Sequence, residues 1–147
     1  FSMNSCVMDE LCNINIIDNI KNNKKKIGIV FNLDKHYDSG SHWVAMFVDL
    51  YKNHIYYFDS YGFDPEEEID VLIKRIMKQA KENKLPMKYE KNDIRHQYNN
   101  SECGVYCMDF IVRLLKGESF KSIKSNKIKD ETMNLRRDIF YTPSKYL

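Results

Sequence analysis

Four residues of types that together catalyse acyl transfer occur in this sequence in the order His42, Asp59, Gln97, Cys103. A thiolate is a strong nucleophile, an imidazole moves protons near neutral pH, and a carboxylate fixes which imidazole nitrogen carries the proton. A side-chain amide can donate a hydrogen bond to the oxyanion that forms during attack on a carbonyl group. Taken singly, each residue is better explained by an ordinary structural role. Their combination predicts a cysteine nucleophile with a histidine base.

The sequence between His42 and Asp59 predicts a hairpin that would bring these two residues together. If the chain reverses around residues 50–53, residue 42 falls opposite roughly residues 59–61. Directly opposed residues on neighbouring strands have Cβ atoms about 4.5–5.5 Å apart, so Asp59 can accept a hydrogen bond from one ring nitrogen of His42. The other nitrogen is then left to act as the general base.

Cys103 follows the polar loop 99–102 and opens a predicted helix. The N–H groups and dipole at a helix N-terminus, together with a nearby imidazolium, can lower a cysteine pKa from about 8.5 to roughly 3.5–7.5. A Cys103 thiolate paired with a His42 imidazolium would therefore supply a nucleophile and a general acid at neutral pH. Gln97 lies six residues earlier, where its amide could join the backbone N–H of Cys103 as an oxyanion donor. The other cysteine of this helix, Cys107, is interpreted as a small buried apolar residue.

These residues need a scaffold, which the apolar pattern predicts to be an α+β fold: a small, mainly antiparallel sheet packed between helices. The run 43–48 is apolar on both faces and predicts a central strand. Asp64 and Pro65 are typical of a helix start, and that helix is expected to reach Glu82. The remaining expected elements are strands at 27–31, 54–58 and 87–89 (extending toward 94), a short helix within 1–26, a helix from Cys103 that Gly117 stops and whose apolar face includes Leu115, and a last helix at 130–140.

Composition restricts the class of protein. The chain has 147 residues, 43% hydrophobic and 30% charged, with a net charge of +2, so we expect one catalytic domain spanning residues 1–147. The near balance of charge disfavours a nucleic-acid binder and a membrane-surface protein, and no apolar run is long enough to cross a bilayer. The four cysteines are few and irregularly spaced, which favours a reducing, intracellular setting. The first residue is Phe1 rather than Met, which suggests a processed chain or a fragment of a longer one.

The motifs around these residues resemble a known family. His42-Trp43 opens a strand, Asp59 lies in Tyr57-Phe58-Asp59-Ser60, and Gln97 precedes Cys103-Gly104 by six residues. This order and spacing resemble the SUMO/ubiquitin-like-protein protease and adenovirus-endopeptidase superfamily of cysteine peptidases, clan CE, over about residues 27–140. Within the superfamily, the stretches 42–49, 92–97 and 102–104 look most like the proteases that process polyproteins in African swine fever virus and other large DNA viruses.

The resemblance implies a function and a role for each residue. Cys103 would be the nucleophile, His42 the base and then the acid, Asp59 the residue that orients His42, and Gln97 the oxyanion donor. Trp43 would bind substrate as one wall of a narrow tunnel that admits only glycine, because an aromatic face over the chain leaves no room for a Cβ atom. The implied activity is a thiol endopeptidase that cuts after Gly-Gly or Gly-X-Gly-like sequences. It would use no metal or other cofactor.

The implied partner is a protein substrate, with no nucleic acid and no membrane required, and the chain is expected to be a monomer. Viral polyprotein processing, in the host cytoplasm or the virion, is the first interpretation. Removal of ubiquitin or a SUMO-like modifier from target lysines is the alternative. An acetyltransferase of related fold and a non-catalytic module that binds ubiquitin-like proteins stay open as further classes, although members of the former resemble a His/Glu/Cys pattern whereas this chain has Asp59.

A zinc site formed by Cys6, Cys12, His36 and His42 is a competing interpretation of the same histidine. The spacings between the two cysteines and between the two histidines are longer than those usual in zinc sites. Such a site would also leave Cys103 without a base. We therefore expect no metal.

Overall fold

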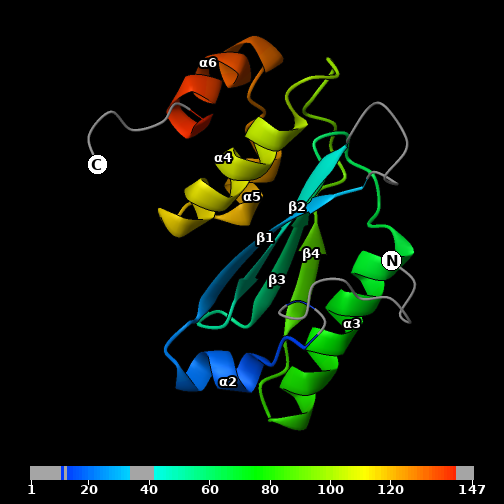
Figure 1. Ribbon diagram of the computed structural model, residues 1–147, viewed down its shortest axis with the longest axis vertical. Coiled ribbons are helices and arrows are strands. Elements are labelled where there is room, and N and C mark those ends of the chain that lie inside the picture. Colours follow the sequence, from blue (N-terminus) through cyan, green and yellow to red (C-terminus); the bar gives the residue numbers. More distant parts are fainter. Residues whose placement is uncertain (1–10, 12, 34–41, 142–147) are drawn as a thin grey trace.

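A four-stranded sheet lies between two groups of helices in the computed structural model, which describes residue 11 and residues 13–33 and 42–141 (Figure 1). The strand order is β1-β2-β3-β4; β1, β2 and β3 pair antiparallel, whereas β3 and β4 pair parallel. The predicted α+β class with a mainly antiparallel sheet is confirmed. The elements are α2 (Ile16–Lys21), β1 (Lys26–Asn32), β2 (Trp43–Asp49), β3 (His54–Phe58), α3 (Glu67–Glu82), β4 (Lys88–Lys91), α4 (Cys103–Leu115), α5 (Phe120–Ser125) and α6 (Asp130–Tyr141).

Strand β2 is the centre of the molecule, as its apolar pattern predicts. Every residue of the strand after Trp43 is buried. Because successive side chains of a strand point to opposite faces, Val44, Met46 and Val48 join the core beneath α3, whereas Ala45 and Phe47 join the core beneath α4. The sheet is thus covered on both sides, and the functional elements are fixed to a rigid middle layer.

The hairpin between β2 and β3 is set by a short turn with its own hydrogen bonds. The buried carboxylate of Asp49 accepts bonds from the backbone N–H groups of Tyr51 at 2.9 Å and Lys52 at 3.0 Å. Asn53 adopts the left-handed conformation, with φ 53°, which asparagine tolerates better than most residues. The turn fixes the pairing of Asp49 with His54 at one end of the ladder. It therefore also fixes what meets at the other end, where β2 begins and β3 ends.

Helix α3 begins later than the sequence predicts. Its N-cap is Glu66, whose backbone is extended, and the first helical residue is Glu67 rather than a residue next to Asp64. The carboxylate of Asp64 pairs with Lys91 at 2.6 Å and so does not cap the helix. The helix ends at Glu82, as expected, and its crossing allows β3 and β4 to run parallel.

The C-terminal helices agree with the sequence in outline. Helix α4 starts at Cys103 and ends two residues before Gly117, which has φ 90°, and α6 covers the predicted last helix. The expectation that Leu115 lies on the buried face is wrong, because 51% of its surface is exposed. Helix α5 is not anticipated by the sequence patterns; it has only six residues, and Ser119 caps it by accepting the N–H of Ser122. The predicted short helix within 1–26 is present as α2, although residues 1–10 and 12 lie outside the described part of the chain.

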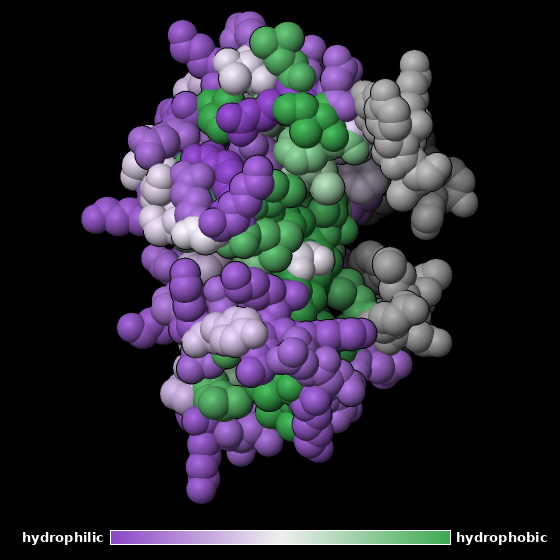
Figure 2. All heavy atoms as spheres, turned by 90° about the vertical axis from the view of Figure 1, so that its left-hand side faces the viewer, coloured by the Kyte–Doolittle hydropathy of each residue, from purple (hydrophilic) through white to green (hydrophobic). Residues whose placement is uncertain are grey.

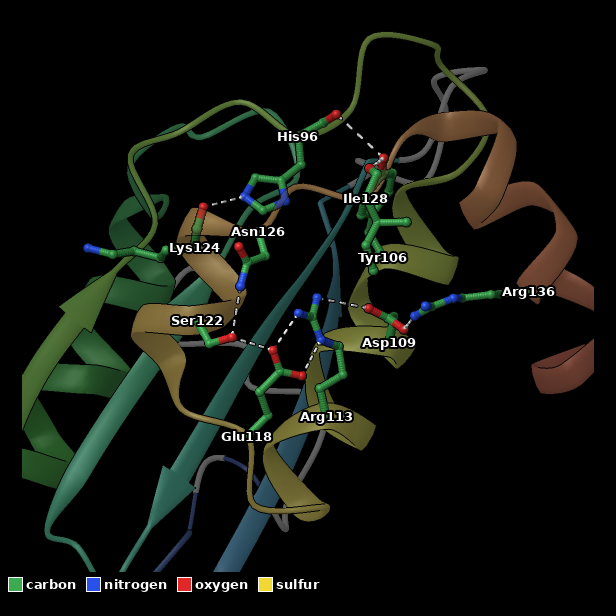
Figure 3. Close-up of polar contacts among 10 residues, drawn as sticks. All are labelled: His96, Tyr106, Asp109, Arg113, Glu118, Ser122, Lys124, Asn126, Ile128 and Arg136. Carbon is green, nitrogen blue, oxygen red and sulfur yellow. Dashed lines mark hydrogen bonds and ion pairs between the residues drawn. The ribbon is translucent and has the colours of Figure 1, made fainter.

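Buried charges tie α4 to its neighbours (Figure 3). Asp109, which is 5% exposed, pairs with Arg113 one turn along α4 and with Arg136 of α6. Arg113 in turn binds the carboxylate of Glu118 through both Nε and Nη2, at 2.7 and 2.6 Å. Bidentate arginine–carboxylate pairs have fixed geometry. These ion pairs therefore fix the middle of α4 to α6 and its C-terminal end to the segment that follows it.

The side of the molecule that faces left in Figure 1 has a band of apolar side chains across its middle (Figure 2). Exposed large apolar residues on α4 and α6 include Leu115, Leu135 and Ile139. None of the helices in the part of the chain that the structure describes is long and apolar enough to span a bilayer.

The turn after Asp59 depends on a glycine, and we predict a measurable difference between two glycine substitutions. Gly62 and Gly117 both have a positive φ, at 81° and 90°. A Cβ atom at Gly62 would lie 3.1 Å from the carbonyl carbon of Ile94 and 3.2 Å from the backbone nitrogen of Arg95, whereas one at Gly117 meets no described atom within 4 Å. We expect Gly117→Ala to cost about 1 kcal/mol of unfolding free energy and Gly62→Ala about 2–4 kcal/mol, because only the latter adds a backbone clash to the conformational strain.

Urea unfolding of the two variants at 25 °C measures this difference. Equal losses in the two variants would contradict the role assigned to the close approach at Gly62.

Candidate active site

His42 and Asp59 meet at the open end of the β2–β3 hairpin, as the sequence predicts. Nε2 of His42 and Oδ1 of Asp59 are 2.9 Å apart, and the aspartate is almost fully buried. Because this bond occupies Nε2, the ring nitrogen left for proton transfer is Nδ1. The contact links the residue just before β2 to the residue just after β3.

The two residues are not directly opposite each other, however. The ladder between β2 and β3 ends at the pair Ala45 and Phe58, and its register continued outward places Tyr61 opposite His42. Tyr61 indeed stacks on the imidazole, with ring centroids 4.7 Å apart. Asp59 reaches the imidazole from a diagonal position. The aromatic ring against one face of His42 limits how the imidazole can turn.

A buried asparagine holds the segment that carries Asp59. Asn92 is fully buried; its Oδ1 accepts the backbone N–H of Asp59 at 2.9 Å, and its Nδ2 donates to the backbone oxygen of Asp59 at 2.6 Å. The backbone N–H of Tyr61 donates to the Asp59 carboxylate at 2.7 Å. The sequence does not predict this role for Asn92, because its only local signal is that a polar residue follows directly after a strand.

Cys103 is the first residue of α4, and the structure brings its thiol to His42. Burial acts to raise the pKa of Cys103, but hydrogen bonds from the His42 ring and from the backbone N–H groups of Trp43 and Gly104 outweigh it and hold the pKa below its ordinary value. Burial likewise acts to lower the pKa of His42, but the hydrogen bonds to Asp59 and Cys103 raise it to about 9. The low pKa of the thiol and the high pKa of the imidazole together favour a thiolate–imidazolium pair at neutral pH.

Cys107 differs from Cys103 although both lie on α4 as reduced thiols. Its side chain is fully buried, and burial raises its pKa well above the ordinary thiol value. Cys107 is therefore a structural apolar residue, as the sequence analysis interprets it.

Gln97 is fully buried and is bonded to the segment that carries Asp59. Its Oε1 accepts the hydroxyl of Ser60 at 2.6 Å, and its Nε2 donates to the backbone oxygen of Asn99 at 2.7 Å. Since Ser60 follows Asp59, the amide is oriented by the same turn that orients the imidazole. The Gln97 amide nitrogen carries two N–H groups, and the bond to Asn99 uses one of them. The Tyr57-Phe58-Asp59-Ser60 motif contains Ser60, but no sequence pattern links its hydroxyl to Gln97.

Trp43 lies next to Cys103. Its backbone N–H donates to the Cys103 sulfur, as described above, and its half-buried side chain packs against the apolar cluster under α4. This position agrees with a side chain beside the reacting atoms. The tunnel that the resemblance implies stays a prediction.

Only His42 of the four residues in the competing zinc interpretation belongs to the described part of the chain. Cys6, Cys12 and His36 lie outside the described residues, and His42 is bonded to Asp59. Within residues 13–33 and 42–141, no group of three or more histidine, cysteine or acidic side chains is arranged to hold a metal ion.

The chain is similar to proteases of large DNA viruses. The model of the Ulp1 protease family, C-terminal catalytic domain, matches residues 14–145. A protein of Acanthamoeba polyphaga mimivirus, named as a thiol protease, is 40% identical over 125 residues, which are 82% of this chain and 41% of that protein. The SUMO-1 cysteine protease of African swine fever virus is 34% identical over 109 residues, 72% of this chain and 40% of that protein. The chain thus spans about two fifths of the length of these relatives.

Solved structures show the same fold. The crystal structure of the African swine fever virus protease superimposes with a TM-score of 0.70 at 33% identity, covering 77% of this chain and 43% of that one. ChlaDub1 from Chlamydia trachomatis superimposes with a TM-score of 0.59 at 14% identity, over 84% of this chain and 62% of that one. The second likeness shows the fold alone.

The two described cysteines should differ sharply in reactivity. The thiolate is the form that iodoacetamide alkylates, so the lowered pKa of Cys103 should move the midpoint of its alkylation below that of an ordinary cysteine, about pH 8.5. His42→Ala removes the imidazolium and should return the midpoint to about pH 8.5 or above. Peptide mapping by mass spectrometry follows Cys103 alone, with Cys107 as the internal control that labels only after unfolding. Reaction of Cys103 only above about pH 8.5 would rule out the ion pair.

Proposed function

Because this chain belongs to the Ulp1 protease family of cysteine proteases, we propose that it is a thiol endopeptidase that cuts peptide bonds through Cys103. The observation that carries the proposal is the chain of contacts from Asp59 to His42 to Cys103, with 2.9 Å between the first pair and a hydrogen bond from the imidazole to the sulfur. These contacts join the start of β2, the end of β3 and the start of α4. Residues 1–147 act as a single catalytic domain in this proposal.

In the first half-reaction the Cys103 thiolate attacks the carbonyl carbon of the scissile bond. The carbonyl oxygen takes the negative charge and accepts hydrogen bonds from the backbone N–H of Cys103 and from Nε2 of Gln97. His42, protonated at the start, gives the proton on Nδ1 to the leaving amine as the C–N bond breaks. The product is a thioester on Cys103, and His42 is left neutral.

In the second half-reaction the neutral imidazole takes a proton from water. The resulting hydroxide attacks the thioester carbonyl, the C–S bond breaks, and the carboxylic acid product leaves. The thiolate and imidazolium are thereby restored. Asp59 keeps the proton of Nε2 in place through both steps and stabilises the imidazolium.

We propose further that Trp43 selects glycine on the acyl side of the cut. Its backbone contacts the sulfur, which puts its ring within reach of the residues that precede the scissile bond. An aromatic face over that chain excludes any Cβ atom, so Gly-Gly or Gly-X-Gly-like sequences are the substrates of this proposal.

The natural substrate in this proposal is a viral polyprotein. The support is the identity to proteins of two large DNA viruses, 40% and 34%. The enzyme would act as a monomer in the host cytoplasm or the virion, without nucleic acid, membrane or cofactor. A second candidate, cleavage of conjugates of a SUMO-like modifier, is favoured by the name SUMO-1 cysteine protease that one relative carries.

Peptide cleavage and covalent capture test the proposal and separate the two substrates. Wild-type chain is incubated with a Gly-Gly-X peptide library and, separately, with ubiquitin and SUMO that carry a C-terminal electrophile. We expect peptide cleavage and no capture of either modifier, because the proposed substrate is a polyprotein. Capture of one modifier at Cys103 would instead support the second candidate.

Cys103→Ala is the matched control in both assays, because it removes one sulfur and should abolish both signals. A wild-type chain that neither cleaves peptides nor reacts with a modifier would reject the peptidase proposal and favour a binding module. Acetyl transfer from acetyl-coenzyme A, measured in parallel, would identify the acetyltransferase class.

Two substitutions should give different kinetic signatures if Gln97 and Trp43 have the proposed roles. Gln97→Ala removes the proposed oxyanion donor, whose contact with the substrate forms only in the transition state, so kcat should fall about 10²–10³-fold with KM little changed. Trp43→Ala opens space over the acyl-side residues, so the preference for Gly-Gly over Gly-Ala substrates should fall about 10-fold or more. Steady-state kinetics on the two peptides measure both effects. An unchanged glycine preference in Trp43→Ala would contradict the tunnel.

A further inference from the structure

The residue directly before the nucleophile is a buried carboxylate. Glu102 is 2% exposed, and its backbone occupies the N-cap position of α4. An acidic N-cap side chain ordinarily accepts a bond from the first turn of its own helix. Glu102 makes no such bond. The first N–H groups of α4 are therefore not taken by this carboxylate.

The carboxylate of Glu102 instead binds to α6. Its Oε2 accepts Nη2 of Arg137 at 2.9 Å, and its Oε1 accepts Nδ2 of Asn134 at 2.7 Å and the hydroxyl of Ser101 at 2.9 Å. The same Nη2 of Arg137 also donates to the backbone oxygen of Ser101 at 2.8 Å. These bonds connect α6 to the two residues that precede Cys103.

This arrangement has an electrostatic consequence for the sulfur. Burial acts to raise the pKa of Glu102, but the bonds from Asn134, Ser101 and Arg137 hold it below its ordinary value, so the group is ionised at neutral pH. A bare negative charge one residue from a thiolate would oppose the second negative charge, since like charges in partly buried surroundings disfavour each other's ionised form. Arg137 supplies the opposite charge.

We propose that Arg137 is a positioning residue that neutralises Glu102 and fixes it against α6, and that this contact keeps the first turn of α4 available to the Cys103 thiolate. The inference rests on the proposed function in taking Cys103 as the nucleophile. It makes α6, which supplies no residue to the Asp59, His42 and Cys103 contacts, a part of the active site.

Other titratable groups near the Cys103 sulfur come from the β2–β3 hairpin, the turn after β3, α4 and α6. His42 and Asp59 come from the hairpin, and Tyr61 from the turn after β3. Cys107 lies one turn along α4, and Tyr141 is at the end of α6, where its hydroxyl would be 3.1 Å from a Cβ atom at Gly104. Of these groups, only His42 is cationic, and its ring is bonded to Asp59. Arg137, which is bonded to Glu102, therefore supplies the positive charge that offsets this carboxylate.

The pH profile of Cys103 alkylation tests this role, because a purely structural contact would not shift it. Arg137→Gln should raise the midpoint by about one pH unit, since Glu102 then stays charged without compensation. Glu102→Gln should lower the midpoint, because Arg137 is left as an unpaired positive charge. The double variant with both substitutions should return close to the wild-type midpoint. Arg137→Lys keeps the charge and should change it little.

Arg136→Gln is the matched control. Arg136 is the neighbouring residue of α6 and pairs with another buried acid of α4, Asp109, which keeps Arg113 as a second partner (Figure 3). The midpoint of this control should stay at the wild-type value. Thermal unfolding followed by circular dichroism checks that each variant is folded; if Arg137→Gln does not fold, the lowered midpoint of Glu102→Gln decides.

An unchanged midpoint in Arg137→Gln, an equal shift in Arg136→Gln, or a double variant that stays shifted would each overturn the inference. Alkylation needs no peptide substrate, so its failure differs from failure of the proposed function. A chain that cleaves no peptide but shows the charge-dependent shifts would reject the peptidase proposal and keep the role of Arg137.

Discussion

A negative sulfur in a place largely shielded from water requires positive charge beside it, and this requirement shapes the structure around Cys103. The charge comes from His42, whose protonated form is favoured by the buried carboxylate of Asp59 at 2.9 Å. Each of the three residues lies at the end of a different element: before β2, after β3 and at the start of α4. A displacement of any one of these elements would separate the positive charge of His42 from the sulfur of Cys103 or from the carboxylate of Asp59. The core on both faces of β2 is therefore as necessary for the chemistry as the three side chains.

Hydrogen bonds from residues other than these three hold the side chains of the site in place. Asn92 binds both backbone groups of Asp59, and Ser60 orients the amide of Gln97. Both asparagine and serine act on the same short turn after β3. A buried amide with all its partners is costly to move, because any displacement leaves polar groups without hydrogen bonds. The turn therefore holds the Asp59 carboxylate and the Gln97 amide in one fixed relation. Arg137 extends the same principle to the segment before the nucleophile.

The sequence predicts best what depends on local pattern. The doubly apolar run of β2, the helix that opens at Cys103 and the meeting of His42 with Asp59 all follow from periodicity and a short turn. Prediction from the sequence fails where a contact with a residue far along the chain determines the local structure. Asp64 pairs with Lys91 rather than capping α3, and the six-residue α5 is too short to show a period. Asn92 and Arg137 act on residues more than thirty positions away, and no spacing rule connects them to their partners.

The separation along the chain between Glu102 and Arg137 bears on when the contact between these two side chains can form. Synthesis proceeds from the N-terminus, so His42 and Asp59 leave the ribosome first, and α6 follows Cys103 by about thirty residues. Contacts between distant parts of a chain form late in folding, because loop closure costs entropy before it is repaid. The contact between Glu102 and Arg137 therefore forms only after α6 has been synthesised and has packed against α4. In the inferred role of Arg137, a partly synthesised chain holds the Glu102 carboxylate without its counter-charge until that late step.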